Sequence, residues 1–264
     1  MVQTETKLIE YLTELKQKYS AISVKSEFEA EGASFNETKH LKSYCDRVGI
    51  DMTVKIGGCE AINDLIQLKE MEVKTIVAPM IESSYAVEKY IKATRKIFSP
   101  EQIECMNFYI NIETVTGYKN AKEILNGQYG EKIDGVVMGR SDLTGSLGLK
   151  NTEVDSQEIK DMALRLSDIL KNKNKDFILG GGITSSSTDF IRTIPYMTGL
   201  ETRKIIFDIK HMDINILPQA IEKAINFELL WLEYLSECIG KPSVIQAERI
   251  KTLKQRLINK SYKC

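Results

Sequence analysis

Hydrophobic and polar positions along this chain follow two alternating periods. Between the candidate strands, apolar residues recur at spacings of three and four, as in "CEAINDLIQLKEM" and "DSQEIKDMALRLSDILKN", which predicts amphipathic helices. Alternating strands and helices are typical of βαβ units and of a parallel sheet buried on both faces. Seven short runs rich in β-branched and apolar residues predict strands: Ala21–Glu27, Met52–Ile56, Thr75–Met80, Phe108–Glu113, Gly135–Gly139, Phe177–Gly180 and Lys204–Asp208. The segment around "IPYMTG" is a weaker candidate for an eighth strand.

Two α/β architectures fit this alternation, an open doubly wound sheet and a closed TIM (β/α)8 barrel. The 264 residues are close to the ~250 that are typical of a barrel. No G-x-G-x-x-G or P-loop follows the first strand. Polar residues recur at the carboxyl ends of several strands, which is where a barrel carries its active site. We therefore predict a barrel over residues 1–212.

Beyond Asp208 the pattern becomes entirely helical. The long apolar segment "NILPQAIEKAINFELLWLEYLSECIG" holds the single tryptophan, Trp231, and "KPSVIQAERIKTLKQRL" follows it. We expect residues 213–264 to form helices that either cap the barrel or pack on a neighbouring subunit, since an apolar helix face does not reveal whose core it joins. The second alternative makes a homo-oligomer the expected assembly.

Composition and charge narrow the class of protein. The net charge of −1 argues against broad electrostatic binding of nucleic acid or an anionic membrane. No apolar run approaches the ~20 residues of a membrane helix, and the charged N-terminus is not a signal peptide. The five cysteines lack metal or redox spacing, which predicts reduced thiols in a cytoplasmic protein.

Two core strands are followed by a carboxylate. Glu113 ends "MNFYINIE", and Asp142 follows the strand in "IDGVVMGRSD". Acids at the mouth of a barrel would converge and repel each other, and a hard divalent cation such as Mg²⁺ or Mn²⁺ would resolve that repulsion. The alternative is one helix N-cap and one salt bridge.

The residues around these acids carry a resemblance. The segments "VKIGG", "APMIES", "NIET" and "GRSDLTGSLG" occur in that order, and from Ser23 to Leu149 the chain resembles the HpcH/HpaI aldolase and citrate lyase β-subunit family. The resemblance implies a barrel of the pyruvate/phosphoenolpyruvate-binding type that makes or breaks a C–C bond beside a keto or acyl group. It implies that Glu113 and Asp142 bind Mg²⁺ or Mn²⁺, which would stabilise an enolate. The expected partner is a small carboxylate-bearing substrate, either a free oxo acid or an acyl-CoA.

The resemblance also suggests catalytic groups, with departures from the family pattern. Lys55 of "VKIGG" stands where the family usually has the arginine that grips substrate, and lysine offers a point charge rather than a planar fork. Glu27 and Glu29 of "SEFEAEG" resemble an acidic citrate lyase segment, or they belong to a charged loop. The histidine of the aldolase branch is missing, and we expect His40 and His211 at the surface. Acid–base work would fall to Glu27, Glu29, Lys55 or a metal-bound water.

Further positions are expected near the substrate. Glu82 of "APMIES" would support the site or cap a helix, and Arg140 would supply the cation that Lys55 only partly replaces. The glycines of "ILGGGITSSS" form either a tight turn or a backbone approach to a ligand. The expected substrate-binding set is Lys55, Glu82, Gly139, Arg140, Ser141 and Gly181.

Two other functions fit the same sequence. A Schiff-base aldolase would use Lys55 or Lys25, because a lysine desolvated in a pocket can be a nucleophile. A non-catalytic barrel that binds a metabolite would explain the missing histidine and the lysine in place of arginine.

Overall fold

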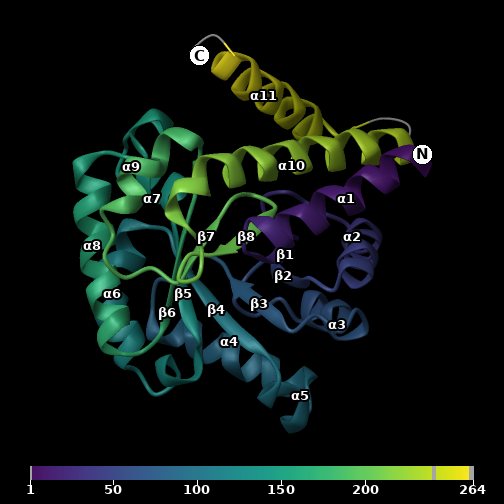
Figure 1. Ribbon diagram of the computed structural model, residues 1–264. Coiled ribbons are helices and arrows are strands. Elements are labelled where there is room, and N and C mark those ends of the chain that lie inside the picture. The colour runs from purple at the N-terminus through teal and green to yellow at the C-terminus, as the bar shows by residue number, and fades with distance from the viewer. Residues whose placement is uncertain (1, 240–241, 262–264) are drawn as a thin grey trace.

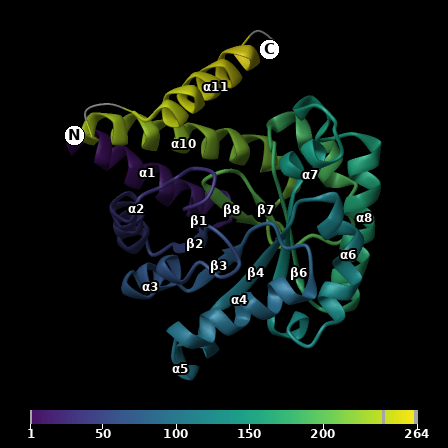
Figure 2. The same cartoon turned by 180° about the vertical axis from the view of Figure 1, so that it is seen from behind.

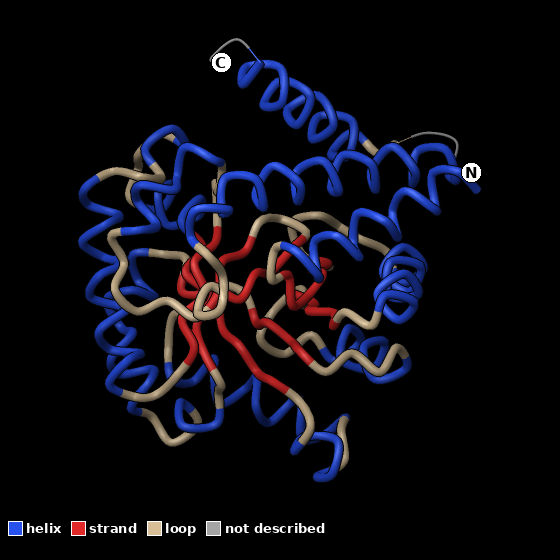
Figure 3. Tube along the Cα trace, viewed as in Figure 1, coloured by secondary structure: helices blue, strands red, loops and turns tan. Residues whose placement is uncertain are grey.

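The structure, a computed structural model, describes residues 2–239 and 242–261 as one barrel surrounded by helices (Figure 1). Figure 3 shows the strands gathered at the centre and the helices around them. The strands are β1 (Ala21–Glu27), β2 (Asp51–Lys55), β3 (Thr75–Ala78), β4 (Asn107–Ile112), β5 (Gly135–Gly139), β6 (Asp176–Gly180), β7 (Gly199–Glu201) and β8 (Ile205–Asp208). The helices are α1 (Val2–Lys18), α2 (Phe35–Val48), α3 (Ile62–Glu70), α4 (Ser84–Ile97), α5 (Pro100–Glu104), α6 (Val115–Asn126), α7 (Arg140–Ser146), α8 (Gln157–Asn172), α9 (Thr188–Arg192), α10 (Leu217–Ile239) and α11 (Val244–Ser261).

The eight strands close in chain order, which confirms the predicted barrel. Neighbours from β1 to β7 are parallel, whereas β8 runs antiparallel to both β7 and β1. Only residues 202–204 separate β7 from β8, and so short a link can join antiparallel but not parallel neighbours. The last strand therefore differs from the all-parallel expectation. The weaker candidate around "IPYMTG" corresponds to β7, which begins at Gly199, the last residue of that segment.

The inner face of the barrel changes from apolar to charged toward the carboxyl ends of the parallel strands. Alternate residues of a strand share one face, so Tyr109 of β4 lies on the same face as Asn111. Tyr109 packs with a small cluster of Val77, Val137 and Ile178 that is separate from the main core. Two residues further along β4, Asn111 is buried and faces a cavity. The charged groups of the barrel thus lie above an apolar floor.

The first and the last two helices form a layer across one side of the barrel. Figures 1 and 2 show α10 lying along α1, and α11 turning back above α10. Leu253 of α11 and Trp231 of α10 are buried. No described helix is long and apolar enough to span a membrane. The described cysteines are all free thiols, and Cys264 lies outside the described residues.

Candidate functional site

A cavity of about 280 Å³ opens at the carboxyl ends of the parallel strands. Strand-borne side chains form its base, and helices α10 and α11 contribute its outer wall. Seven of the ten site residues that the sequence suggested line it, which are Glu27, Lys55, Glu113, Gly139, Ser141, Asp142 and Gly181. An eighth, Glu29, reaches the cavity by an ion pair to Lys55, whereas Arg140 and Glu82 do not line it.

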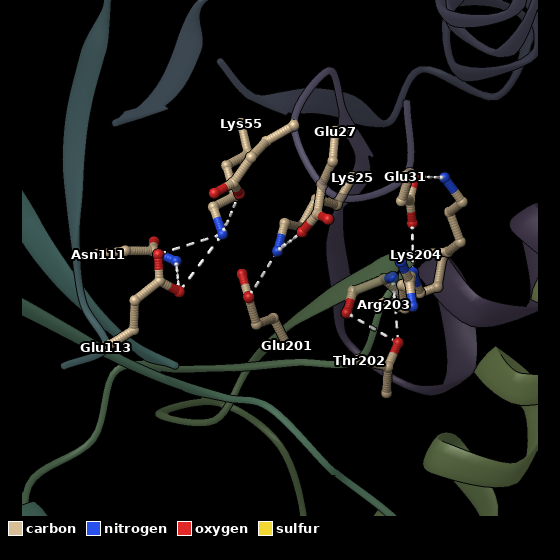
Figure 4. A network of polar contacts seen from close by, with 12 residues as sticks. Lys25, Glu27, Glu31, Lys55, Asn111, Glu113, Glu201, Thr202, Arg203 and Lys204 are labelled. Carbon is tan, nitrogen blue, oxygen red and sulfur yellow. Dashed lines mark hydrogen bonds and ion pairs between the residues drawn. The ribbon is translucent and has the colours of Figure 1, made fainter. Parts of the chain in front are cut away.

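Glu113, directly after β4, is held at the base of the cavity by three donors. Its Oε1 accepts a hydrogen bond from the backbone N–H of Met80 at 3.0 Å, and its Oε2 accepts one from the amide of Asn111 at 2.7 Å. The ammonium of Lys55 lies 3.3 Å from both oxygens (Figure 4). A carboxylate has about four lone-pair sites, so Glu113 keeps room for one more partner.

Asp142 lies in the first turn of α7, after the neighbouring strand β5. Among the described residues, its carboxylate has no ion-pair partner and accepts no hydrogen bond. Burial raises its pKa, and the like charge of Glu113 raises it further, which shows that the two acids act on each other. Gly139 lets the end of β5 pass close to Glu113, because a Cβ there would lie 2.5 Å from Glu113 Oε2.

Two such carboxylates fit a hard divalent cation. Mg²⁺ is commonly held by one or two carboxylates together with waters and substrate oxygens. Within the described residues no group of three or more His, Cys, Asp or Glu side chains is arranged to hold a metal ion, so the protein would supply only Glu113 and Asp142. The unpartnered carboxylate of Asp142 and the free capacity of Glu113 are the donors that such an ion requires.

Lys25 of β1 forms the centre of a second charged group beside the first. Its ammonium lies 2.8 Å from Glu27 and 2.7 Å from Glu201 at the end of β7 (Figure 4). Burial would raise the pKa of Glu27, but Lys25 and Lys55 outweigh it and lower the pKa to about 2. Burial raises the pKa of Glu201, whose Oε2 accepts no hydrogen bond. Lys25 thus pairs with two acids whose pKa values shift in opposite directions, that of Glu27 downward and that of Glu201 upward.

Lys55, like Lys25, is held in its positively charged form by neighbouring acids. Its Nζ lies 2.7 Å from Glu29. Burial would lower its pKa, but Glu113 and Glu27 outweigh burial and raise the pKa above the ordinary lysine value. The pKa of Lys25 is raised for the same reason, by Glu201 and Glu27. Both amines are therefore held in the protonated form, which is not nucleophilic.

Arg140, which the sequence suggested as a substrate-binding cation, does not line the cavity, and its side chain is fully buried. It donates to the carbonyls of Gly180 and Gly181 and forms an ion pair with Asp155. With its donors engaged in this way, the guanidinium fastens the end of β6 to the segment before α8.

Glu82 also lies outside the cavity lining. Its carboxylate accepts a hydrogen bond from the hydroxyl of Thr114, at 2.6 Å, and its carbonyl accepts one from Asn120. Thr114 follows Glu113 and caps α6. Glu82 thus supports the position of Glu113 through its neighbour, the first of the two alternatives that the sequence left open.

The glycine run after β6 forms a tight turn. Gly181 and Gly182 have φ values of 76° and 66°, a region that favours glycine. A Cβ on Gly181 would lie 2.5 Å from the backbone N of Ser141. The turn therefore packs closely against the start of α7 while Gly181 still lines the cavity.

Neither histidine reaches the cavity. His40 stacks on Tyr234 and Trp231, and His211 pairs with Asp208 at the far end of antiparallel β8. Both side chains are exposed, as predicted.

Several lining residues were absent from the sequence-based set, among them Asn111, Glu201, Arg203, Arg249 and Arg256. Glu201 ends a strand on an acid, much as Glu113 follows one, but strand β7 has three residues and is too short to be recognised from its sequence pattern. Asn111 lies two residues before Glu113 in the same strand and therefore shares its face. For the arginines of α11 there was no comparable signal, because helical periodicity does not show which face meets the barrel.

Comparisons with known proteins agree with this architecture. The profile of the HpcH/HpaI aldolase/citrate lyase family matches residues 44–175, half of the chain. Among curated proteins, no sequence matches. The HpcH/HpaI aldolase from Desulfitobacterium hafniense DCB-2 is similar in structure with a TM-score of 0.58 and 14% identity, over 72% of this chain and 81% of that one. Citrate synthase SbnG has a TM-score of 0.58 and 16% identity, over 74% and 82%. At such identities these structures show the shared fold.

Proposed function

The chain belongs to the HpcH/HpaI aldolase/citrate lyase family, and from that premise we propose that it makes or breaks a C–C bond in a small oxo acid or acyl-CoA. The bond lies next to the keto or acyl carbonyl, where cleavage leaves negative charge on a substrate oxygen. We further propose dependence on Mg²⁺ or Mn²⁺. The cation would be held by Glu113 and Asp142 and would supply Lewis-acid stabilisation of that charge.

One observation carries this proposal. Glu113 and Asp142 come from the carboxyl ends of adjacent strands and face one cavity, the charge of Glu113 raises the pKa of Asp142, and Asp142 has no ion-pair or hydrogen-bond partner among the described residues. A pair of facing acids without a cation between them is costly. A structural salt bridge or an N-cap would have given Asp142 a protein partner.

The lysines and acids of the cavity have separable roles in the proposed reaction. The ammonium of Lys55, fixed by Glu29 and Glu113, provides the positive charge that pairs with a substrate carboxylate. Glu27 is held ionised by Lys25 and acts by fixing that lysine rather than by transferring a proton.

Glu201 is the proposed proton-transfer group. Its Oε2 is buried and accepts no hydrogen bond, and its raised pKa brings it closer to neutral pH than an ordinary carboxyl. General acids and bases act best when their pKa lies near the working pH. Glu201 would thus take the place of the acid–base histidine that is expected in the aldolase branch of the family and is missing here.

The Schiff-base alternative is disfavoured by the raised pKa values of Lys55 and Lys25. Treatment with borohydride in the presence of pyruvate tests this directly. We expect no covalent adduct by mass spectrometry, whereas an adduct on Lys55 would restore the alternative.

The proposed function can be tested without knowledge of the second substrate. Exchange of methyl protons for deuterium, followed by proton NMR in D₂O, reports charge formation beside a carbonyl in pyruvate or in acetyl-CoA. We expect exchange in one of these probes with Mg²⁺, loss of exchange with EDTA, and a fall of at least about a hundredfold in Glu113→Gln. Full exchange in metal-free buffer would contradict the proposal.

A further inference from the structure

A third charged group, made of three arginines, lines the same cavity. Arg203 of the β7–β8 turn and Arg249 and Arg256 of α11 all line the cavity. The turn and the helix are far apart in the sequence, yet their guanidinium groups interact electrostatically. A cluster of like charges brought together from separate elements requires an explanation.

Around the three arginines, the cations outnumber the acids that form ion pairs with them. Glu31 is shared by two cations, since it accepts from Arg203 Nε at 2.8 Å and from the ammonium of Lys204 (Figure 4). Glu27 pairs with Lys25, although its charge also acts on Arg203, and Glu37 accepts from the backbone N–H of Ser34 and from the side-chain amide of Gln246. Among the described residues, Glu31 is therefore the acid that forms ion pairs with the turn.

Helix α11 adds two further cations, Arg249 and Arg256. Arg249 forms a two-point ion pair with buried Glu228 of α10, at 2.5 and 2.8 Å, which neutralises both groups. Arg256 is partly buried, and no ion pair joins it to any described residue. Burial lowers its pKa, and the charge of Arg249 lowers it further, so its guanidinium is short of an anion. In ion pairs, the four cations Arg203, Lys204, Arg249 and Arg256 share only two acids, Glu31 and Glu228.

We propose that Arg203, Arg249 and Arg256 bind a phosphoryl group carried by the substrate, which makes the substrate class phosphorylated oxo acids or acyl compounds. This rests on the proposed function, because it assigns the far end of the molecule whose reactive end lies at Glu113. A phosphoryl group carries a charge of about −1.5 to −2 at neutral pH, so it would give Arg256 the ion-pair partner that no described residue supplies. Its several oxygens accept from guanidinium forks that approach from different elements, whereas a carboxylate is satisfied by one fork.

The test uses inorganic phosphate as the probe and needs neither metal nor turnover. Isothermal titration calorimetry on the full chain measures phosphate affinity in the native protein and in Arg256→Gln. We expect binding in the native protein and a roughly tenfold weaker Kd in the variant, the size of one charge-assisted contact. Arg256→Lys should recover part of the loss. Lys254→Gln is the matched control, since it removes a positive charge from the same helix at an exposed side chain that pairs with Glu233.

Several outcomes would overturn the assignment. These are no phosphate binding at millimolar concentrations, equal affinity in Arg256→Gln and the native protein, and an equal loss in Lys254→Gln. Malonate, a dicarboxylate, is a further probe, and malonate binding tighter than phosphate would replace the phosphoryl group with a carboxylate. Because the titration contains no divalent cation, its result is independent of the deuterium exchange, and the two proposals can fail separately.

Discussion

Single residues of the cavity owe their behaviour to immediate neighbours rather than to residue type. Glu27 and Glu201 share Lys25, yet the pKa of one is lowered and that of the other is raised. Lys25 and Lys55 act on both acids, but together they outweigh burial at Glu27, whereas burial outweighs them at Glu201. Environments that push two carboxyl pKa values apart are typical of acid–base assignments in active sites.

Glu201→Gln tests the proton-transfer role. In the native protein we expect the deuterium exchange rate to rise with pH through a pKa above that of an ordinary carboxyl, because the ionised form accepts the proton. In Glu201→Gln the rise of the exchange rate with pH should disappear, and the rate itself should fall by about 10²- to 10⁴-fold. Glu27→Gln, whose acid is already ionised, should keep the rise with pH. An unchanged profile in Glu201→Gln would remove the residue from the mechanism.

Arg140→Met tests the structural role of the buried guanidinium. The variant leaves Asp155 without its partner and frees the carbonyls of Gly180 and Gly181. We expect a loss of about 3–5 kcal/mol in the free energy of unfolding, measured by urea denaturation. Arg165→Met, at an exposed position of α8, should change it by less than about 0.5 kcal/mol. A stable Arg140→Met protein would revive the substrate-binding role.

At the level of elements, the strand ends and the turns after them set the positions of the site. The sequence pattern predicted seven strands within a few residues and placed Glu113 and Asp142 at strand ends. It did not predict the direction of β8, because alternation of residues carries no information about which way a strand runs. Strand β7 has three residues, too few for a periodic signal, so Glu201 was missed with it. The arginines of α11 depend on how a helix docks, which is a tertiary effect.

Gly139→Ala tests the close approach of β5 to Glu113. The added Cβ would lie 2.8 Å from Glu113 Cβ and closer still to Oε2, so the carboxylate must move. We expect a loss of about 1–3 kcal/mol in stability and weakened metal binding. Gly145→Ala in α7 is the control, since a Cβ there meets nothing within 4 Å. It should be neutral or stabilising by about 0.5–1 kcal/mol. Equal metal affinity in both variants would contradict this packing argument.

At the scale of the whole molecule, charged side chains lie inside the barrel above a layer of apolar ones. Helices α10 and α11 border the opening of the cavity. Glu201, Lys25 and Lys55 are all buried. Such groups are tolerated when they are paired, and here two lysines serve four acids. The proposed cation at Asp142 and Glu113 would offset this excess of acid. The homo-oligomer stays a prediction that the single chain does not test.

The raised pKa values imply a dependence of stability on pH. The native state holds protons on Glu201 and Asp142 at pH values where the unfolded chain has released them. Their contribution is therefore full below the ordinary carboxyl pKa and is lost as pH rises through the raised values. Glu27 acts in the other direction, with stability lost as pH falls toward about 2. Urea denaturation across this range should show a shallower decline with rising pH in Glu201→Gln than in the native protein, and an identical decline would contradict the assignment.

The most direct test of the central claim is Mn²⁺ binding followed by electron paramagnetic resonance. Titration of the native protein should show one bound ion per chain, and Glu113→Gln and Asp142→Asn should each weaken its binding by at least about tenfold, since each removes one of two charged ligands. Asp189→Asn, at an exposed acid on α9 that does not line the cavity, should bind as the native protein does. Mn²⁺ binding that is absent from the native protein, or unchanged in Glu113→Gln and Asp142→Asn, would contradict a metal-dependent lyase at this site.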